Sequence, residues 1–188
     1  MIKKKANKKL ARQAAEKLIR ESKILLEAPI MLNDIIQHLR TRFDIDVHGK
    51  DMSDKFSGIL VTKDNTFGIL YNSSMSKNRI RFTIAHELGH LMLCHQFGKE
   101  IVYEKYNLNK EIDWWELEAN TFAANLLMPQ KLLQKDTKNL KKGDISLLSK
   151  KYLVSEAAMT NRIYFSNQLL GVSSDPYYGN NIDEDNDI

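Results

Sequence analysis

Two histidines four residues apart, with a glutamate directly after the first, are the residues of this sequence best suited to chemistry. They lie in His86-Glu-Leu-Gly-His90, which matches the pattern H-E-x-x-H. On a helix, positions four apart share one face, so both imidazoles can bind one Zn²⁺ at about 2.0–2.1 Å. Glu87 then lies near the open coordination position and can accept a proton from a water molecule there. The spacing also fits two hydrogen-bonded histidines without a metal.

A catalytic zinc usually has three protein ligands, and the third does not follow from the same segment. The longer pattern H-E-x-x-H-x-x-G-x-x-H fails, because Leu93 and Gln96 stand at its glycine and last histidine. Cys94 would lie about 12 Å from His86 along a continuous helix, and His95 would point to the opposite side. The third ligand must therefore come from another element.

A helix expected at about 113–127 offers two carboxylates, Glu116 and Glu118. They flank the two edges of the apolar stripe of that helix, and helical geometry alone does not choose between them. The stripe consists of Trp115, Ala119, Phe122 and Leu126.

The helix that carries the histidines is expected at about 78–95, with an apolar face opposite them. That face contains Ile84, Ala85, Leu88, Leu91 and Met92. Gly89 lies inside this helix, where glycine costs roughly 1 kcal/mol relative to alanine. This glycine indicates that another backbone approaches the helix closely.

Other periodic segments surround these two helices. Alternating or apolar runs predict a strand at 43–48, a β-hairpin at 57–71 and a short strand at 101–103. An exposed hairpin edge would let a substrate strand add by backbone hydrogen bonds, whereas a covered edge would make the hairpin purely structural. Further helices are expected at about 7–27, 31–42, 129–135, 145–151 and 156–169, with Pro29 ending the first and Ser155 capping the last.

The composition fits a soluble globular protein of 188 residues, with 43% hydrophobic and 28% charged residues. Cys94 is the single cysteine, and neither a signal peptide nor an apolar run of about 18 residues is visible, so we expect a cytoplasmic protein. The net charge of +4 combines a strongly basic amino-terminal segment with an acidic tail that we expect to be disordered. We expect four parts: a basic helix at 1–27, a metal-binding domain at 28–135, a helical pair at 144–172 and the tail at 173–188.

Two longer blocks resemble the ImmA/IrrE family of metallo-endopeptidases. They are Arg81-Phe-Thr-Ile-Ala-His-Glu-Leu-Gly-His90 and Glu118-Ala-Asn-Thr-Phe-Ala-Ala-Asn-Leu-Leu-Met-Pro129. The resemblance implies an α+β, mostly helical zincin-like fold with a small hairpin or sheet beside the metal helix and a small helical pair after it. It also implies one Zn²⁺ per chain, held by His86, His90 and Glu118, with Glu87 as the general base.

The residues lead to a hypothesis for the reaction, and the resemblance implies the partner. Zinc would lower the pKa of a water molecule towards about 7, and Glu87 would accept its proton and pass it to the leaving amine. The expected substrate is a specific protein, such as a transcriptional repressor or antitoxin encoded nearby in a phage or other mobile element. Tyr103, Tyr106 and His95 are candidate donors to the developing oxyanion.

Two other functions remain compatible with the residues. The helices at 145–151 and 156–169 loosely resemble a helix-turn-helix, in which Lys150, Lys151 and Arg162 would contact DNA. A non-proteolytic interaction or toxin–antitoxin module is the second alternative, and Trp114 and Trp115 would then suit a partner surface. No membrane partner is expected.

Overall fold

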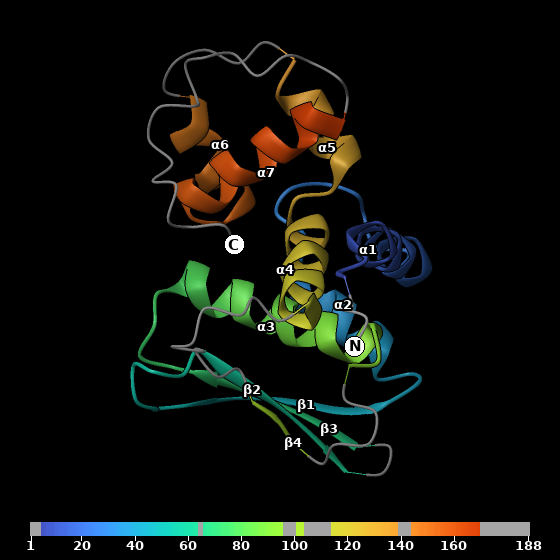
Figure 1. Ribbon diagram of the computed structural model, residues 1–188, viewed down its shortest axis with the longest axis vertical. Coiled ribbons are helices and arrows are strands. Elements are labelled where there is room, and N and C mark those ends of the chain that lie inside the picture. Colours follow the sequence, from blue (N-terminus) through green and yellow to red (C-terminus); the bar gives the residue numbers. More distant parts are fainter. Residues whose placement is uncertain (1–4, 64–65, 96–100, 104–113, 139–143, 170–188) are drawn as a thin grey trace.

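A computed structural model describes residues 5–63, 66–95, 101–103, 114–138 and 144–169. Its elements along the chain are α1 (Lys8–Ser22), α2 (Leu32–Leu39), β1 (Asp44–Lys50), β2 (Gly58–Lys63), β3 (Thr66–Asn72), α3 (Lys77–Met92), β4 (Ile101–Tyr103), α4 (Trp114–Leu127), α5 (Gln130–Asp136), α6 (Asp144–Tyr152) and α7 (Glu156–Leu169). In Figure 1 the sheet forms the lowest layer, α3 covers one of its faces, and α4 lies on α3. The α+β architecture with a small sheet beside the metal helix and a helical pair after it is confirmed.

The sheet has four strands in the order β1-β3-β2-β4. β2 and β3 form the predicted antiparallel hairpin, β1 adds parallel to β3, and β4 adds antiparallel to β2. β3 is therefore central, and β2 is covered by β4 from Ile59 to Val61. The hairpin thus offers no open edge along this stretch, so the covered alternative is correct there.

Helix α3 begins and ends through identifiable contacts. The Ser76 hydroxyl accepts a hydrogen bond from the Arg79 backbone N–H at 3.4 Å, as expected of a helix cap. The helix ends at Met92, three residues before its predicted end. Cys94 then adopts a left-handed conformation (φ 59°), and the His95 N–H donates to the His90 carbonyl at 3.0 Å. The prediction that His95 points to the opposite side is therefore wrong, because the chain reverses at Cys94.

Gly89 is the position where α3 and α4 approach each other closely, as its location within the helix predicted. A β-carbon at Gly89 would lie 3.1 Å from both the Cα and the carbonyl oxygen of Ala119. It would also lie 3.2 Å from the Phe122 β-carbon. Only glycine fits this crossing without a shift of α4, so the crossing fixes how α4 is rotated against α3.

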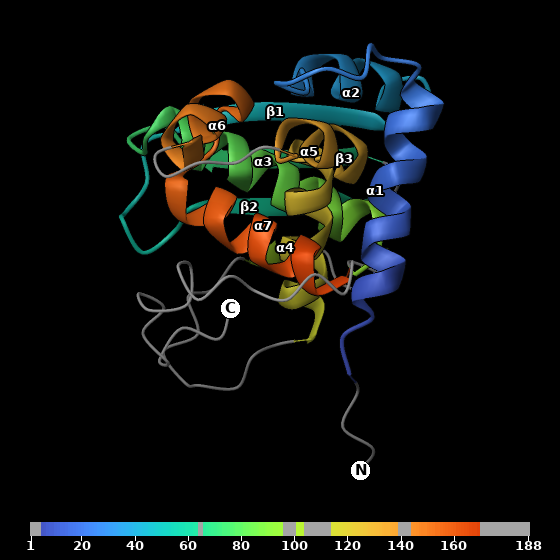
Figure 2. The ribbon, with the colours of Figure 1, turned by 90° about the horizontal axis from the view of Figure 1, so that it is seen from above.

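Helix α1 is shorter than its apolar pattern predicted. It ends at Ser22, where Lys23 takes a left-handed conformation (φ 53°), and not at Pro29. Leu18 is fully buried, whereas Leu25 is 74% exposed and does not join the core. The apolar periodicity of the sequence thus continues past the last residue that packs against the core. Helix α1 itself packs against α4 (Figure 2).

The C-terminal helices are tied to the rest of the chain by buried polar contacts. The Arg162 guanidinium donates to the Met128 carbonyl at 3.1 Å and to Asn125 Oδ1 at 2.8 Å. Ser155 caps α7 as predicted, accepting from the Ala158 N–H at 3.1 Å. Arg162 is 5% exposed, so this cation serves packing within the protein and is withdrawn from any DNA-facing surface.

None of the helices in the described part of the chain is both long and apolar enough to cross a membrane.

Candidate metal centre

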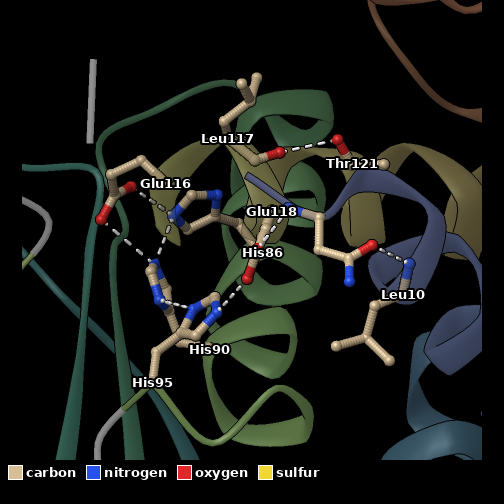
Figure 3. A network of polar contacts seen from close by, with 9 residues as sticks. Leu10, His86, His90, His95, Glu116, Leu117, Glu118 and Thr121 are labelled. Carbon is tan, nitrogen blue, oxygen red and sulfur yellow. Dashed lines mark hydrogen bonds and ion pairs between the residues drawn. The ribbon is translucent and has the colours of Figure 1, made fainter. Parts of the chain in front are cut away.

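Three side chains from α3 and α4 converge on one point. His86 Nε2 lies 3.0 Å from Glu116 Oε2, and His90 Nε2 lies 3.3 Å from Glu116 Oε1. The two Nε2 atoms are 3.0 Å apart, and all three ligand atoms lie within 4.8 Å of one another. Figure 3 shows the Glu116 carboxylate facing both imidazoles. Two nitrogens and a carboxylate gathered in this way suit Zn²⁺.

The protonation states of this group also fit a metal ion. Burial lowers the pKa of His90 to about 4, so the imidazole is neutral at pH 7 and has a lone pair to offer. Burial alone would raise the pKa of Glu116, but its hydrogen bonds with His86 and His90 hold that pKa well below the usual value. Neutral imidazoles and an ionised carboxylate are the forms that bind zinc.

Glu118 lies outside this group, although the family resemblance assigned it as the third ligand. Its Oε2 is 2.9 Å from His95 Nε2, and its Oε1 accepts from the Asn7 backbone N–H at 2.6 Å. Two positions apart on a helix means about 200° of rotation, so the carboxylates of Glu116 and Glu118 leave α4 in different directions. The structure thus brings together His86, His90 and Glu116. Glu118 contacts this group indirectly, through His95.

Both histidines of the group are held at their other ring nitrogen. His86 Nδ1 lies 2.9 Å from Asn120 Oδ1, and His90 Nδ1 lies 3.0 Å from His95 Nδ1. Such contacts fix the tautomer and the ring orientation of a metal ligand. Sequence reasoning did not find Asn120, although it stands four residues after Glu116 and so shares its face of the helix.

Glu87 is fully buried against the sheet. A β-carbon at Gly58 in β2 would clash with the Thr83 side chain, and it would lie 3.1 Å from the Leu70 carbonyl oxygen and 3.2 Å from Glu87 Oε1. Gly58 therefore leaves the room in which the Glu87 carboxylate lies. This position, one residue after His86 on the same helix, is compatible with the predicted role of a base.

A large cleft of ≈ 1220 Å³ adjoins the group, and Glu116 lies on its wall. Residues from α1, α3, α4 and α7 line the cleft. Glu116 is the one acidic residue in this lining, and five lining residues are basic. The basic residues are Lys8, Lys9, Arg12, Arg79 and Arg162. Apolar residues such as Phe82, Met128 and Phe165 also contribute. The cleft is large enough for several residues of a peptide.

The structure also bears on the candidate oxyanion donors and on the two tryptophans. His95, a candidate oxyanion donor, is engaged with His90 and Glu118. The Tyr103 side chain and all of Tyr106 lie outside the described residues. The Trp114 ring packs against the His95 ring with centroids 5.6 Å apart and touches Trp115, so the tryptophans support the outer side of the centre.

Comparisons with known proteins find a matching family, a related phage protein and a similar fold. The sequence profile of the M78 peptidases, described as the IrrE N-terminal-like domain, matches residues 40–164. An "Uncharacterized immunity region protein 2" of Bacillus phage phi105 is 36% identical over 61 residues, which cover 32% of this chain and 37% of the phage protein. A solved structure titled "Mycobacterium tuberculosis transcriptional regulator" has a similar fold, with a TM-score of 0.59 and 19% identity over 82% of this chain and 46% of that one. The chain therefore spans less than half the length of either protein.

Proposed function

Because the chain belongs to the IrrE N-terminal-like family of M78 peptidases, we propose that it is a zinc-dependent endopeptidase that cuts a specific protein. The observation that carries the proposal is the convergence of His86, His90 and Glu116 beside a cleft. The similarity to a phage immunity-region protein supports a regulator as the substrate, such as a repressor or antitoxin encoded nearby.

We assign the metal to His86, His90 and Glu116. Glu118 is the competing third ligand, but its oxygens are already engaged by His95 and by the Asn7 backbone N–H. The Glu116 side chain is 29% exposed, so this carboxylate also borders the cleft through which a substrate would arrive. One zinc ion per chain is expected.

Zinc at this site supplies a Lewis acid that polarises a peptide carbonyl and makes a water molecule more acidic. Glu87 acts as the general base and then as the general acid. Its carboxylate accepts a proton from the water molecule that attacks the carbonyl carbon, and it delivers this proton to the leaving nitrogen as the C–N bond breaks. Full burial of Glu87 keeps competing bulk water away from this proton transfer.

The cleft supplies the substrate site. Three of its basic residues, Lys8, Lys9 and Arg12, come from α1, whereas α4 and α7 contribute apolar residues. A segment with both acidic and apolar side chains complements this lining, since opposite charges across an interface favour encounter and register. The enzyme would therefore select a substrate segment of this kind.

Two measurements test the proposal. Elemental analysis of the purified protein should give about one zinc per chain, and Glu116→Ala and His90→Ala should each lose it. Glu87→Gln should keep the zinc and lose cleavage of the repressor or antitoxin encoded nearby. A protein that holds no zinc even after zinc is added back, or a fully active Glu87→Gln variant, would refute the assignment.

A further inference from the structure

A chain of polar contacts leads from the proposed metal site to the start of α1. His90 Nδ1 meets His95 Nδ1 at 3.0 Å, and His95 Nε2 meets Glu118 Oε2 at 2.9 Å. Glu118 Oε1 in turn accepts from the Asn7 backbone N–H at 2.6 Å. His90, His95 and Glu118 are all buried, so water does not compete for the contacts among these three, whereas Asn7 lies at the exposed end. Figure 3 shows the histidine and Glu118 part of this chain.

Each member of the chain has a fixed role if His90 binds the metal through Nε2. The proton of the neutral imidazole must then sit on Nδ1, which donates to His95 Nδ1. The His95 proton must sit on its Nε2, which donates to Glu118. The Glu118 carboxylate can only accept and the Asn7 backbone N–H can only donate. The hydrogen bonds therefore run from His90 through His95 to Glu118, and Glu118 also accepts from Asn7.

We infer that His95, Glu118 and the backbone N–H of Asn7 form a directional relay that holds His90 in its metal-binding tautomer. These are positioning residues, which act through His90 and do not touch the metal. The inference rests on the proposed zinc site. It gives Glu118 a role different from that of a ligand, and it makes the amino end of α1 part of the metal centre, although Asn7 lies outside the family match at 40–164.

The relay makes an unusual prediction for Glu118→Gln. An amide has one oxygen and one NH₂ group, and the Asn7 N–H requires the oxygen. The NH₂ group would then face His95 Nε2, so the His95 proton would move to Nδ1 and be donated to His90 Nδ1. The His90 proton would move to Nε2, the atom that must bind zinc. We therefore expect this nearly isosteric change to lower zinc affinity by about 10–100-fold, as for other outer contacts of metal ligands.

Removing the Asn7 N–H should cancel that effect. Asn7→Pro lacks the N–H, so the amide introduced at position 118 is free to turn its oxygen towards His95 and restore the original direction. Asn7→Ala is the matched control, because it removes the side chain that caps Leu10 at 3.0 Å but keeps the N–H. In the Asn7→Pro background, Glu118→Gln should change zinc affinity by less than about threefold, whereas in the Asn7→Ala background the full loss should persist.

The experiment is a double-mutant cycle on the full chain, with zinc affinity measured by chelator competition and the ligand field by the absorption spectrum of bound Co²⁺. Thermal unfolding of each metal-free variant separates loss of fold from loss of affinity. Equal loss in all three backgrounds would overturn the relay and indicate a direct ligand role for Glu118. No loss in any background would overturn it as well. Absence of zinc binding by the unaltered chain would instead refute the proposed function itself.

Discussion

Replacing Gly89 with alanine would place a methyl group at the crossing of α3 and α4. The new carbon would lie 3.1 Å from the Cα and carbonyl oxygen of Ala119, closer than ordinary van der Waals contact. Because the nearest atoms belong to the backbone, α4 must shift by a few tenths of an ångström. Overpacking of this kind typically costs about 1–3 kcal/mol.

A second effect opposes this cost. Alanine favours a helix interior over glycine by about 1 kcal/mol, so an open position would gain stability from the substitution. The net free energy of unfolding of Gly89→Ala should therefore fall by roughly 0–2 kcal/mol, and each 1 kcal/mol lowers the melting temperature by about 2–4 °C at this size. The shift of α4 would also move Glu116 away from the histidines, so zinc affinity should fall with it.

Urea and thermal unfolding of the metal-free protein measure the first effect, and chelator competition measures the second. Gly68→Ala in β3 is the control, because its added carbon would meet only Val61 Cβ at 3.8 Å, which is ordinary contact. A Gly89→Ala protein about 1 kcal/mol more stable than the unaltered protein, with the same zinc affinity, would refute the reasoning. That result would mean that the crossing does not set the position of Glu116.

Three further changes test other parts of the structure. Gly58→Ala should lower peptidase activity about tenfold or more while zinc content is kept, because the new carbon would clash with the Thr83 side chain, one turn before Glu87, and would crowd Glu87 itself; unchanged turnover would contradict this. Asp136 has a lowered pKa, since its hydrogen bonds from α6 outweigh the opposing effect of burial. Its stabilising effect is therefore present above the unfolded pKa of about 3.9 and is lost as the pH falls through the lower folded value. Asp136→Asn should accordingly cost about 1 kcal/mol in urea unfolding at pH 7 and nothing in strong acid. Lys8→Glu combined with Lys9→Glu should raise KM and reduce the salt dependence of cleavage without changing zinc content, and an unaltered KM would show that the basic side of the cleft does not meet the substrate.

Most of the architecture could be predicted from the sequence because apolar periodicity reports which residues face a core. The two helices of the metal centre, the hairpin and the short strand at 101–103 all lie within a few residues of their predicted places. The helix at the amino end is the main exception. Its apolar spacing runs on through Leu25 and Leu26, but no neighbouring element covers those residues, and both are exposed.

The choice between Glu116 and Glu118 shows where single-sequence reasoning stops. Both flank the same apolar stripe, and their difference depends on the rotation of α4 against α3. That rotation is set by the contact of Gly89 with Ala119. Glu116 is three residues before Ala119 and so lies on the same side of α4, whereas Glu118 is one residue before it and is turned by about 100°. The glycine was visible in the sequence, but its partner was not.

His95 was placed on the wrong side for a different reason. The prediction extended α3 to residue 95, and a continuous helix would have carried the ring away from His90. The reversal depends on a left-handed backbone at Cys94, which a residue other than glycine or asparagine seldom adopts. Composition therefore gave no sign that a third histidine would return to the centre.

Helix α1, which lies outside the family match, contributes both to the proposed substrate cleft and to the outer contacts of the metal site. Its first turn presents Lys8 and Lys9 to the cleft, and its capping residue Asn7 donates to Glu118. The substrate site and the outer contacts of the metal site thus share one short segment. If α1 moved as a unit, substrate binding and zinc affinity would change together. Local changes should separate them: charge reversal at Lys8 and Lys9 acts on the cleft alone, and Asn7→Pro acts on the relay. A segment outside the family profile would in this way influence both substrate binding and metal binding.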